Sequence, residues 1–356
     1  MNIDFVDCDE RQLPAVVEFF QRCYSPTYRL AADLPLLRWQ FGGPTPEAGR
    51  YHLKLATRGA TVLGCLGFVP APLDVAGSSF RAAWTANWMV DPAHRRLGLG
   101  PLLLRQLMAE FDAVLSVGLE RDAVDLLPRM GWEDFGDLTR YAMVLDRAGL
   151  ARLTGSVATV DVGPTGQYRP SMSSPDVVAA SPAAAGTEVW DRVWGRHGAG
   201  TRRTAAFLDW RYRRHPVFDY HSFVSGQDQG PPTGFVVYRI ERVRDLPVSV
   251  GRIVELVAEP AAVPDLLATV AGHARAAGVA VLDYFCSGRR FDAAVVASGF
   301  LPGDCPEVRD LPLLFQPVNR DRRAIRFMGY VARLPAGTAG LDWYVTRGDG
   351  DQDRPN

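Results

Sequence analysis

Apolar and polar positions along the first half of the chain predict short strands that alternate with helices. Runs rich in β-branched and aromatic residues, bounded by turn residues such as Arg58-Gly59, are typical of strands. From Leu104 to Phe111, apolar residues recur at i, i+3, i+4 and i+7, the spacing of one helical face. The strands predicted in this half cover residues 51–57, 61–69, 82–90, 113–117 and 140–145, and a short helix ends at Gly131.

The second half repeats this order of elements. Its predicted elements are strands over residues 235–240, 253–257 and 279–285 and helices over residues 265–277 and 291–298. Strands that alternate with helices in this way favour an α/β fold with a mixed sheet in each half.

Two landmarks align the halves with each other. An aromatic motif reads LRWQF around Trp39 and LDWRY around Trp210, and a proline follows each motif. A glycine that ends a helix and precedes an aromatic residue occurs at Gly131 and, after a nearly equal separation, at Gly299. Such an internal repeat predicts a duplicated fold, and the shared motif predicts a packing role for Trp39.

The segment between the halves has the composition of a linker. Residues 151–186 are rich in Ala, Ser, Gly, Pro and Thr and show no sustained helical or strand period. We therefore predict a first domain over residues 1–150, a linker over 151–186 and a second domain over 187–356. At roughly 150 residues per domain, a chain of 356 residues is long enough for both domains to bury a core.

Composition and charge exclude several classes of protein. With 47% apolar residues the chain is not disordered, and 39 basic against 40 acidic side chains give no overall attraction to nucleic acid or to an anionic membrane. No run of about 18 apolar residues occurs, so we expect a cytoplasmic protein. The five cysteines are scattered and form no C-x-x-C pair, which argues against a disulfide framework and against a metal site.

The loop over residues 91–100 carries the strongest chemical signal. It reads DPAHRRLGLG and joins a predicted strand to the helix through Leu104. Gly98 and Gly100 allow the main chain to approach a ligand, and the amides at a helix N-terminus bind phosphate well, with Arg95 and Arg96 as additional cations. The loop lacks the Gly-Lys-Ser/Thr of a Walker loop and the third glycine of a Rossmann fingerprint. An ordinary glycine turn with solvated arginines is the alternative.

This loop resembles the acyl-CoA pyrophosphate loop of the GNAT superfamily of N-acyltransferases. The resemblance rests on Arg95-x-x-Gly98-x-Gly100 after a strand and Val90-Asp91-Pro92, and it extends over about residues 1–145. The second half resembles the same fold in degenerate form, so the resemblance implies two tandem GNAT-like domains with mixed sheets. It also implies acyl-CoA, either acetyl-CoA or a longer acyl-CoA, as co-substrate. The residues implied to bind it are Met89, Val90, Arg95, Arg96, Leu97, Gly98, Leu99 and Gly100.

The equivalent crossing in the second half has lost the features of a phosphate loop. Residues 259–264 read EPAAVP and contain neither glycine nor arginine. We therefore expect one CoA per chain, bound by the first domain.

The catalytic residues follow the family pattern less closely. The tyrosine that protonates the departing thiolate in much of the superfamily corresponds to Leu127, so another group must supply that proton or the thiolate leaves unaided. Asn87 lies on the strand before the loop and could orient the thioester or the amine. Strict alternation along this strand puts Trp84 and Trp88 on one face and Asn87 on the other. A polar residue bonded to a neighbouring loop is the alternative for Asn87.

The C-terminal segment over residues 343–355 suggests a narrower resemblance. This segment and the two-domain layout resemble tandem-GNAT sugar N-acyltransferases, which acylate amino groups of nucleotide-linked sugars. The resemblance implies that the tail covers the acceptor cleft, where Asp349 would help to deprotonate the amine. Asp351 and Arg354 would then bind the acceptor. A disordered terminus is the alternative.

Other functions remain open at this stage. A different small amine, such as an aminoglycoside, a peptide or a thiol precursor, is a possible acceptor, because the fold does not fix the substrate. Aminoacyl transfer from a charged tRNA is disfavoured by the near-neutral charge. A CoA-binding sensor without catalytic activity is the alternative that is not an enzyme. Leu127 suggests it, because leucine stands where much of the superfamily has a tyrosine that donates a proton.

Overall fold

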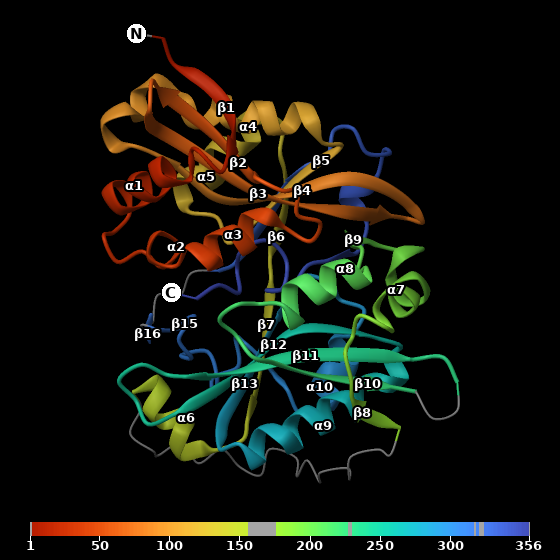
Figure 1. The fold of residues 1–356 in the computed structure, drawn as a ribbon. Helices are drawn as coiled ribbons and strands as arrows, with labels where there is room; N and C mark the ends of the chain where they lie inside the picture. Colours follow the sequence, from red (N-terminus) through yellow and green to blue (C-terminus); the bar gives the residue numbers. More distant parts are fainter. Residues whose placement is uncertain (1, 156–175, 227–229, 317, 320–323, 356) are drawn as a thin grey trace.

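The computed structural model describes residues 2–155, 176–226, 230–316, 318–319 and 324–355. It contains two large mixed sheets that lie one above the other, with helices packed on their outer faces and further chain between them (Figure 1). The predicted α/β fold with two GNAT-like mixed sheets is confirmed. Most of the linker predicted over residues 151–186 lies outside the described residues.

The first sheet has the strand order β1-β2-β3-β4-β5-β17-β6. Two short strands, β9 and β18, extend it beside β3. The strands are β1 (Asp4–Asp9), β2 (Arg50–Arg58), β3 (Thr61–Val75), β4 (Ser78–Val90), β5 (Ala113–Val117), β6 (Glu133–Asp137), β9 (Ala199–Thr201), β17 (Arg326–Tyr330) and β18 (Trp343–Tyr344).

Helices cover both faces of this sheet because each presents an apolar stripe to it. The predicted helix through Leu104 forms as α4, whose buried leucines pack with β5 and with Trp132 in one core cluster. A second cluster joins α1, α2 and α3 to the opposite face around Phe19, Phe20 and Phe41. The helices are α1 (Leu13–Cys23), α2 (Arg29–Ala32), α3 (Leu34–Gly42), α4 (Leu99–Glu110) and α5 (Arg121–Leu126), with the short 3-10 helices η1 (Pro92–Leu97) and η2 (Leu127–Met130).

The second sheet has the order β14-β7-β13-β12-β11-β10-β8. Its strands are β7 (Thr139–Val144), β8 (Val177–Ala179), β10 (Tyr220–Ser225), β11 (Gly234–Arg242), β12 (Ser249–Ala258), β13 (Val279–Cys286) and β14 (Leu301–Pro302), and β15 (Leu314–Phe315) and β16 (Val318–Asn319) form a small separate ladder. The remaining helices and turns are α6 (Arg147–Thr154), α7 (Gly186–Trp190), η3 (Asp191–Gly195), α8 (Ala205–Leu208), η4 (Asp209–Arg213), η5 (Pro260–Ala262), α9 (Val263–Ala276), α10 (Asp292–Ala297) and η6 (Thr338–Gly340).

The two sheets exchange strands across the predicted domain boundary. The strand predicted over residues 140–145 forms as β7, but it pairs with β13 in the second sheet and not with strands of the first half. In return, β17 from the second half is inserted between β5 and β6 of the first sheet. Periodicity identified a strand here but not its partner, because register between distant segments is set by tertiary packing.

The aromatic motifs of the two halves meet where the halves join. The rings of Trp39 in α3 and Trp210 in η4 stack at 4.9 Å with an interplanar angle of 20°. Each indole Nε1 donates to the other residue's main-chain oxygen, at 3.2 Å from Trp39 and 3.1 Å from Trp210. This reciprocal contact gives both tryptophans the packing role that their shared motif predicts.

Among the described residues, no helix is both long and apolar enough to cross a membrane. The same residues contain no group of three or more His, Cys, Asp or Glu side chains placed to hold a metal ion.

Candidate functional site

The loop after β4 forms a compact turn that ends at the N-terminus of α4. Asp91 begins it, because its carboxylate accepts a hydrogen bond from the Ala93 amide at 2.9 Å and lies 3.4 Å from Arg22 Nε. The turn η1 follows, and Gly98 then takes the left-handed conformation with φ +68° directly before Leu99. A residue with a side chain is strained in that conformation, which is why glycine is needed at this point.

The exposed surface of this loop is cationic. Arg95, Arg96 and Leu97 are all exposed, and neither arginine forms an ion pair within the part of the chain that the structure describes. The first amides of a helix have no partner inside it, and in the twelve-residue α4 no side chain caps those of Leu99 and Gly100. Free amides, the positive end of the helix and two guanidinium groups together suit a pyrophosphate.

Beside the loop, β4 and β5 separate from each other. They pair in parallel only from Ala82 to Trp84, although β4 continues to Val90. A hydrogen bond of 2.6 Å from the Thr85 hydroxyl to Ser116 marks the point where the strands diverge. Beyond it, among the residues that the structure describes, β4 has a pairing partner on one edge only, β3, and residues 87–90 are only partly buried. The open edge therefore offers main-chain groups of Met89 and Val90 to a ligand that lies between the strands.

Asn87 sits at a β-bulge that sequence periodicity did not predict. Its φ is +49°, and two residues of β4 oppose one residue of β3 at this point. The bulge makes the prediction of strict alternation wrong beyond Ala86. Trp88 packs with the core under α4, on the opposite side from Trp84. Asparagine tolerates a left-handed backbone better than most residues, which explains why it occupies this position.

The bulge directs the Asn87 side chain toward α2 and α3. The Asn87 amide donates to the Tyr28 hydroxyl, and its oxygen accepts a hydrogen bond of 3.2 Å from Gln40. Burial raises the pKa of Tyr28 to about 12, so this phenol stays protonated near neutral pH. Sequence reasoning missed Tyr28 and Gln40, since neither belongs to a motif that carries chemistry.

A contact from Trp88 joins the open strand to the helix that follows the loop. The Trp88 indole donates to the Gly100 oxygen at 3.2 Å. A Cβ atom at Gly100 would lie 3.1 Å from the same indole nitrogen. The second glycine of the loop therefore allows close packing on Trp88, whereas Gly98 supplies the unusual backbone.

Leu127 is buried and cannot contribute a proton. It begins η2, has 1% of its surface exposed and belongs to the core under α4. The phenol of Tyr28 reaches the bulge from the other face of the sheet.

Two strands of the second sheet diverge in a similar way, but a later segment of the protein fills the space between them. The strand β12 pairs with β13 only as far as Ile253. Beyond that point, the Tyr344 hydroxyl bonds the amide and the oxygen of Leu256 at 3.0 and 2.9 Å, and the Thr346 hydroxyl donates to the Val254 oxygen at 2.7 Å. The segment that contains Tyr344 and Thr346 thus occupies the space that stays open in the first sheet.

Titration with CoA is therefore expected to saturate at one molecule per chain. The first sheet offers an open edge beside a glycine loop, whereas the second offers a filled edge and a crossing without glycine. Calorimetric titration of the full chain measures this number directly. A stoichiometry of two would contradict the difference between the sheets.

The structure places Asp349 in the interior, which disfavours its predicted role as a base. Its carboxylate has no exposed surface and lies 2.8 Å from Arg203, which also pairs with Glu255 at 2.7 Å. These two carboxylates hold the pKa of Arg203 well above its usual value, and burial raises the pKa of Glu255. A carboxylate held in a closed ion pair cannot approach an incoming amine, so Asp349 has a structural role.

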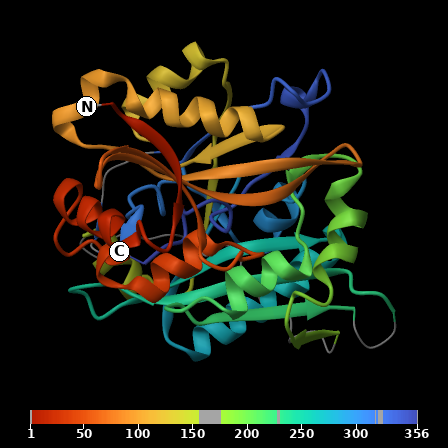
Figure 2. The same ribbon diagram turned by 45° about the horizontal axis from the view of Figure 1, so that its top comes forward.

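Asp351 and Arg354 lie closer to the open strand. They form an ion pair with each other, and Gln352 between them donates to the Val117 oxygen at 2.8 Å, at the end of β5. The charge of Arg354 lowers the pKa of Tyr28 and that of Asp351 raises it, so both side chains lie near the Tyr28 hydroxyl. The tail therefore passes below the divergence of β4 and β5 and ends near the helices α1–α3 (Figure 2). Contacts hold the tail in place in this region.

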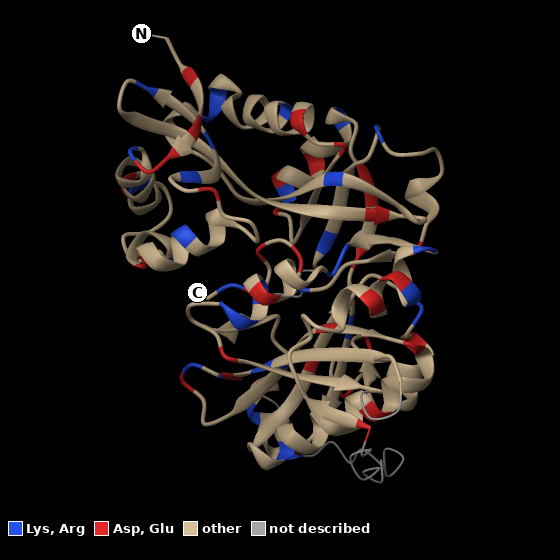
Figure 3. Ribbon diagram, turned by 45° about the vertical axis from the view of Figure 1, so that its right-hand side comes forward, with Lys and Arg blue, Asp and Glu red and all other residues tan. Residues whose placement is uncertain are grey.

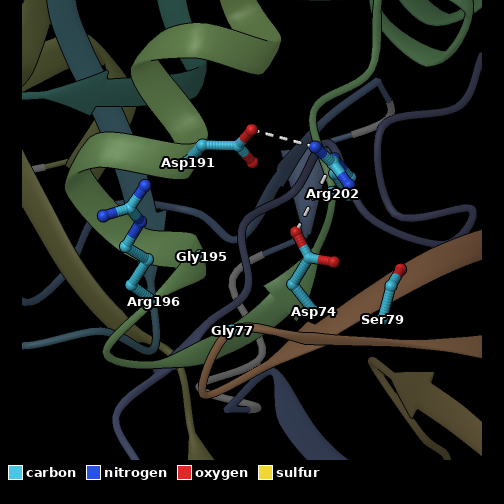
Figure 4. A pocket seen from close by; sticks show the side chains of 7 residues that line it. All are labelled: Asp74, Gly77, Ser79, Asp191, Gly195, Arg196 and Arg202. Atoms are coloured by element: carbon cyan, nitrogen blue, oxygen red, sulfur yellow. Dashed lines mark hydrogen bonds and ion pairs between the residues drawn. The ribbon is translucent and has the colours of Figure 1, made fainter.

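One further polar cavity, of about 190 Å³, lies near the opposite end of β4 from the loop (Figure 4). Arg202 reaches two carboxylates across it, Asp191 at 2.9 Å and Asp74 at 3.8 Å. Its lining includes Gly77 at the tip of the β3–β4 hairpin, so it belongs to the support of that hairpin and not to the candidate site.

Comparison with known proteins agrees with this geometry. Residues 6–134 match the family model described as an acetyltransferase (GNAT) domain. No curated protein sequence matches the chain significantly.

Solved structures with the same fold cover nearly the whole chain. A GCN5-related N-acetyltransferase from Anabaena variabilis is 15% identical with a TM-score of 0.58, over 92% of this chain and 72% of that one. N-myristoyltransferase from Saccharomyces cerevisiae with bound myristoyl-CoA is 11% identical with a TM-score of 0.58, over 92% and 78% of the two chains. A probable N-acyltransferase from Enterococcus faecalis is 11% identical with a TM-score of 0.58, over 92% and 72%.

These relatives share the fold with this chain, and the family match covers the part of the chain that carries the glycine loop and the open strand. The chain therefore contains a GNAT acetyltransferase domain in residues 6–134 and has the two-sheet fold of GNAT-type N-acyltransferases, which supports an enzyme of that type with acyl-CoA as co-substrate.

Proposed function

We propose that this protein transfers an acyl group from acyl-CoA to the amino group of a nucleotide-linked amino sugar. The observation that carries the acyl-CoA part is the open edge of β4 beside the left-handed Gly98 at the N-terminus of α4. The tail that lies along this opening and brings Asp351 and Arg354 to it supports the acceptor part.

In this proposal the first domain holds the donor. The amides from Leu97 to Gly100 bind the pyrophosphate, and Arg95 and Arg96 neutralise it by charge-assisted hydrogen bonds. The main chain of Met89 and Val90 aligns the thioester along the open edge. Holding the thioester next to an amine is the largest catalytic contribution, since orientation can supply up to roughly 7 to 11 kcal/mol in the best intramolecular cases.

The acceptor side combines the tail with the bulge of β4. Asp351 and Arg354 bind the sugar or its substituents, while Gln40 and Tyr28 fix the orientation of Asn87. Because the raised pKa keeps Tyr28 protonated, its phenol can donate a proton to the departing thiolate, the role of the family tyrosine that Leu127 replaces. The ammonium group formed when the amine attacks the thioester then returns a proton to the Tyr28 phenolate, so the step balances.

A panel of acceptors tests this function. The full-length protein is incubated with acetyl-CoA and a nucleotide-linked amino sugar, the corresponding free amino sugar, an aminoglycoside or a short peptide. Release of the CoA thiol and the mass of the product are measured. We expect the nucleotide-linked amino sugar to be acylated fastest.

The alternatives give different results in the same panel. Preferential acylation of the aminoglycoside or the peptide would replace the proposed acceptor but keep the enzyme class. Tight CoA binding without amine-dependent thiol release from any acceptor would indicate a CoA-binding sensor and contradict the proposal.

A further inference from the structure

The C-terminal tail fills the narrow end of the opening between β4 and β5. The chain ends between the two sheets, where both basic and acidic residues occur (Figure 3). The side-chain amide of Gln352 donates to the Val117 oxygen at 2.8 Å, and the Gly118 amide donates to the Arg326 oxygen in β17 at 2.8 Å. Because successive residues of a strand direct their main-chain groups to opposite edges, the Val117 oxygen faces β4. Gln352 therefore lies in the opening itself.

Gln352 fits closely against the end of β5. Gly118 has φ +73°, and a Cβ atom there would lie 2.3 Å from both the nitrogen and the oxygen of the Gln352 amide. Any larger residue at position 118 would displace this side chain. Glycine thus provides both the left-handed backbone and the close approach of Gln352.

The tail residue Gly350 closes the opening on the side that faces the second sheet. Gly350 is buried, and its Cβ position lies 3.3 Å from a methyl group of Val117 and 3.7 Å from the Trp84 ring. Trp84 is held in place, since it is 1% exposed and its indole donates to the Thr201 hydroxyl at 2.8 Å. The tail therefore packs against a side chain from each of the two diverging strands.

This closed end lies a short distance from the position proposed for the thioester. The last residues that pair β4 with β5 are Trp84 and Leu115, so Val117 is level with Ala86. Met89 lies three residues further along β4, at most about 10 Å at the usual rise of a strand. An acyl chain that runs from the thioester toward the closed end thus has room for few carbon atoms.

We propose that Gln352 limits the length of the acyl group, so that the donor is acetyl-CoA or another short-chain acyl-CoA. The loop that binds the pyrophosphate lies at the wide end of the opening, so a donor that follows β4 directs its acyl group toward Gln352. An acetyl group leaves the tail in place. A long chain must displace Gln352 and leave the Val117 oxygen without its partner, and an unpaired buried polar group is costly. This inference rests on the proposed acyltransferase function, because it requires acyl-CoA in this opening.

Binding of the donor alone tests this limit without any acceptor. Calorimetric titration of the full chain gives dissociation constants for CoA, acetyl-CoA and decanoyl-CoA. We expect the wild type to bind CoA and acetyl-CoA with similar affinity. It should bind decanoyl-CoA about tenfold more weakly or worse, the effect of one buried polar group left without a partner.

Replacing Gln352 with alanine should relax the limit. The smaller side chain joins the opening to a cavity of about 200 Å³ whose lining includes Leu119 and Ile325. Gln352→Ala should therefore bind decanoyl-CoA several times more tightly than the wild type does, and CoA equally well. Asp351→Asn is the matched control, because it breaks the ion pair with Arg354 but leaves Gln352 in place. It should keep the wild-type order of affinities.

The outcomes separate this inference from the proposed function. Equal affinity of the wild type for decanoyl-CoA and acetyl-CoA would overturn the inference alone, and this comparison stays decisive if a variant fails to fold. An unchanged difference in Gln352→Ala would also overturn it, since another group would then set the limit. Tight CoA binding without acylation of any amine in the acceptor panel would contradict the proposed function alone. A wild type that binds no CoA would overturn both.

Discussion

Replacing Gly98 with valine is expected to weaken CoA binding by about tenfold to a hundredfold. Gly98 has φ +68°, where a β-branched residue costs about 1 to 3 kcal/mol, so the loop would shift and move its amides away from the pyrophosphate. No atom lies within 4 Å of the Cβ position, so the added side chain would occupy the space through which the anion approaches. Calorimetric titration with CoA gives the dissociation constant.

Gly59 provides a matched control for this substitution. It lies in the turn between β2 and β3, has φ +59° and also has no atom within 4 Å of its Cβ position. Gly59→Val should therefore introduce a similar backbone strain without changing CoA affinity. Equal CoA affinities for Gly98→Val and the wild type would show that the pyrophosphate binds elsewhere.

Replacing Asp353 with alanine is expected to destabilise the protein by about 3 to 5 kcal/mol, the usual cost of removing one partner from a buried ion pair. Asp353 has no exposed side-chain surface, and it pairs with Arg239 and accepts a hydrogen bond of 2.7 Å from Tyr220. Without its carboxylate, the positive charges of Arg239 and Arg211 would stay buried with less negative charge beside them. Denaturant unfolding of the variant and the wild type gives the difference.

A nearby tail residue serves as the control for Asp353. Asp351 is 9% exposed, but its partner Arg354 is 35% exposed and can turn to water when the carboxylate is removed, so Asp351→Ala should cost less than Asp353→Ala. A loss in Asp353→Ala no larger than in Asp351→Ala would contradict the structural role of the tail. The same reasoning predicts that removal of residues 349–356 lowers stability, so truncation is not a clean test of catalysis.

Asp353 also sets part of the acid sensitivity of the fold. Its contacts with Arg239 hold the pKa of Asp353 below its usual value despite burial. A carboxylate whose pKa is lower in the folded state stabilises the protein above its unfolded pKa of about 3.9 and loses that contribution as the pH falls further. Stability below about pH 4 should therefore decline less steeply in Asp353→Asn than in the wild type.

The sequence predicted the parts of the fold that depend on local patterns. The helix through Leu104 and the loop with Gly98 formed as expected, since periodicity and glycine placement act over a few residues. The repeat around Trp39 and Trp210 also predicted a contact role, because both motifs had kept their apolar residues. The expectation that a ligand binds along β4 at Met89 and Val90 came from the family resemblance, because no pattern in the strand itself indicates an open edge.

The features that shape the site arise from contacts between distant segments. The exchange of β7 and β17, the bulge at Asn87 and the filled edge of β12 each depend on which segments pair, and periodicity does not encode that choice. The sequence resemblance placed the aspartates of the tail at the acceptor cleft, with a disordered terminus as the alternative. In the structure Asp349 and Asp353 neutralise buried arginines from distant segments of the chain, which no local pattern could show.

The crystal structure of the full chain with acetyl-CoA is the most direct test of the central claim. The account predicts one acetyl-CoA per chain, with its pyrophosphate at the amides between Leu97 and Gly100 and its thioester along the open edge of β4 at Met89 and Val90. Acetyl-CoA bound at the edge of β12 in place of Tyr344 and Thr346, or at any site away from the α4 loop, would contradict it.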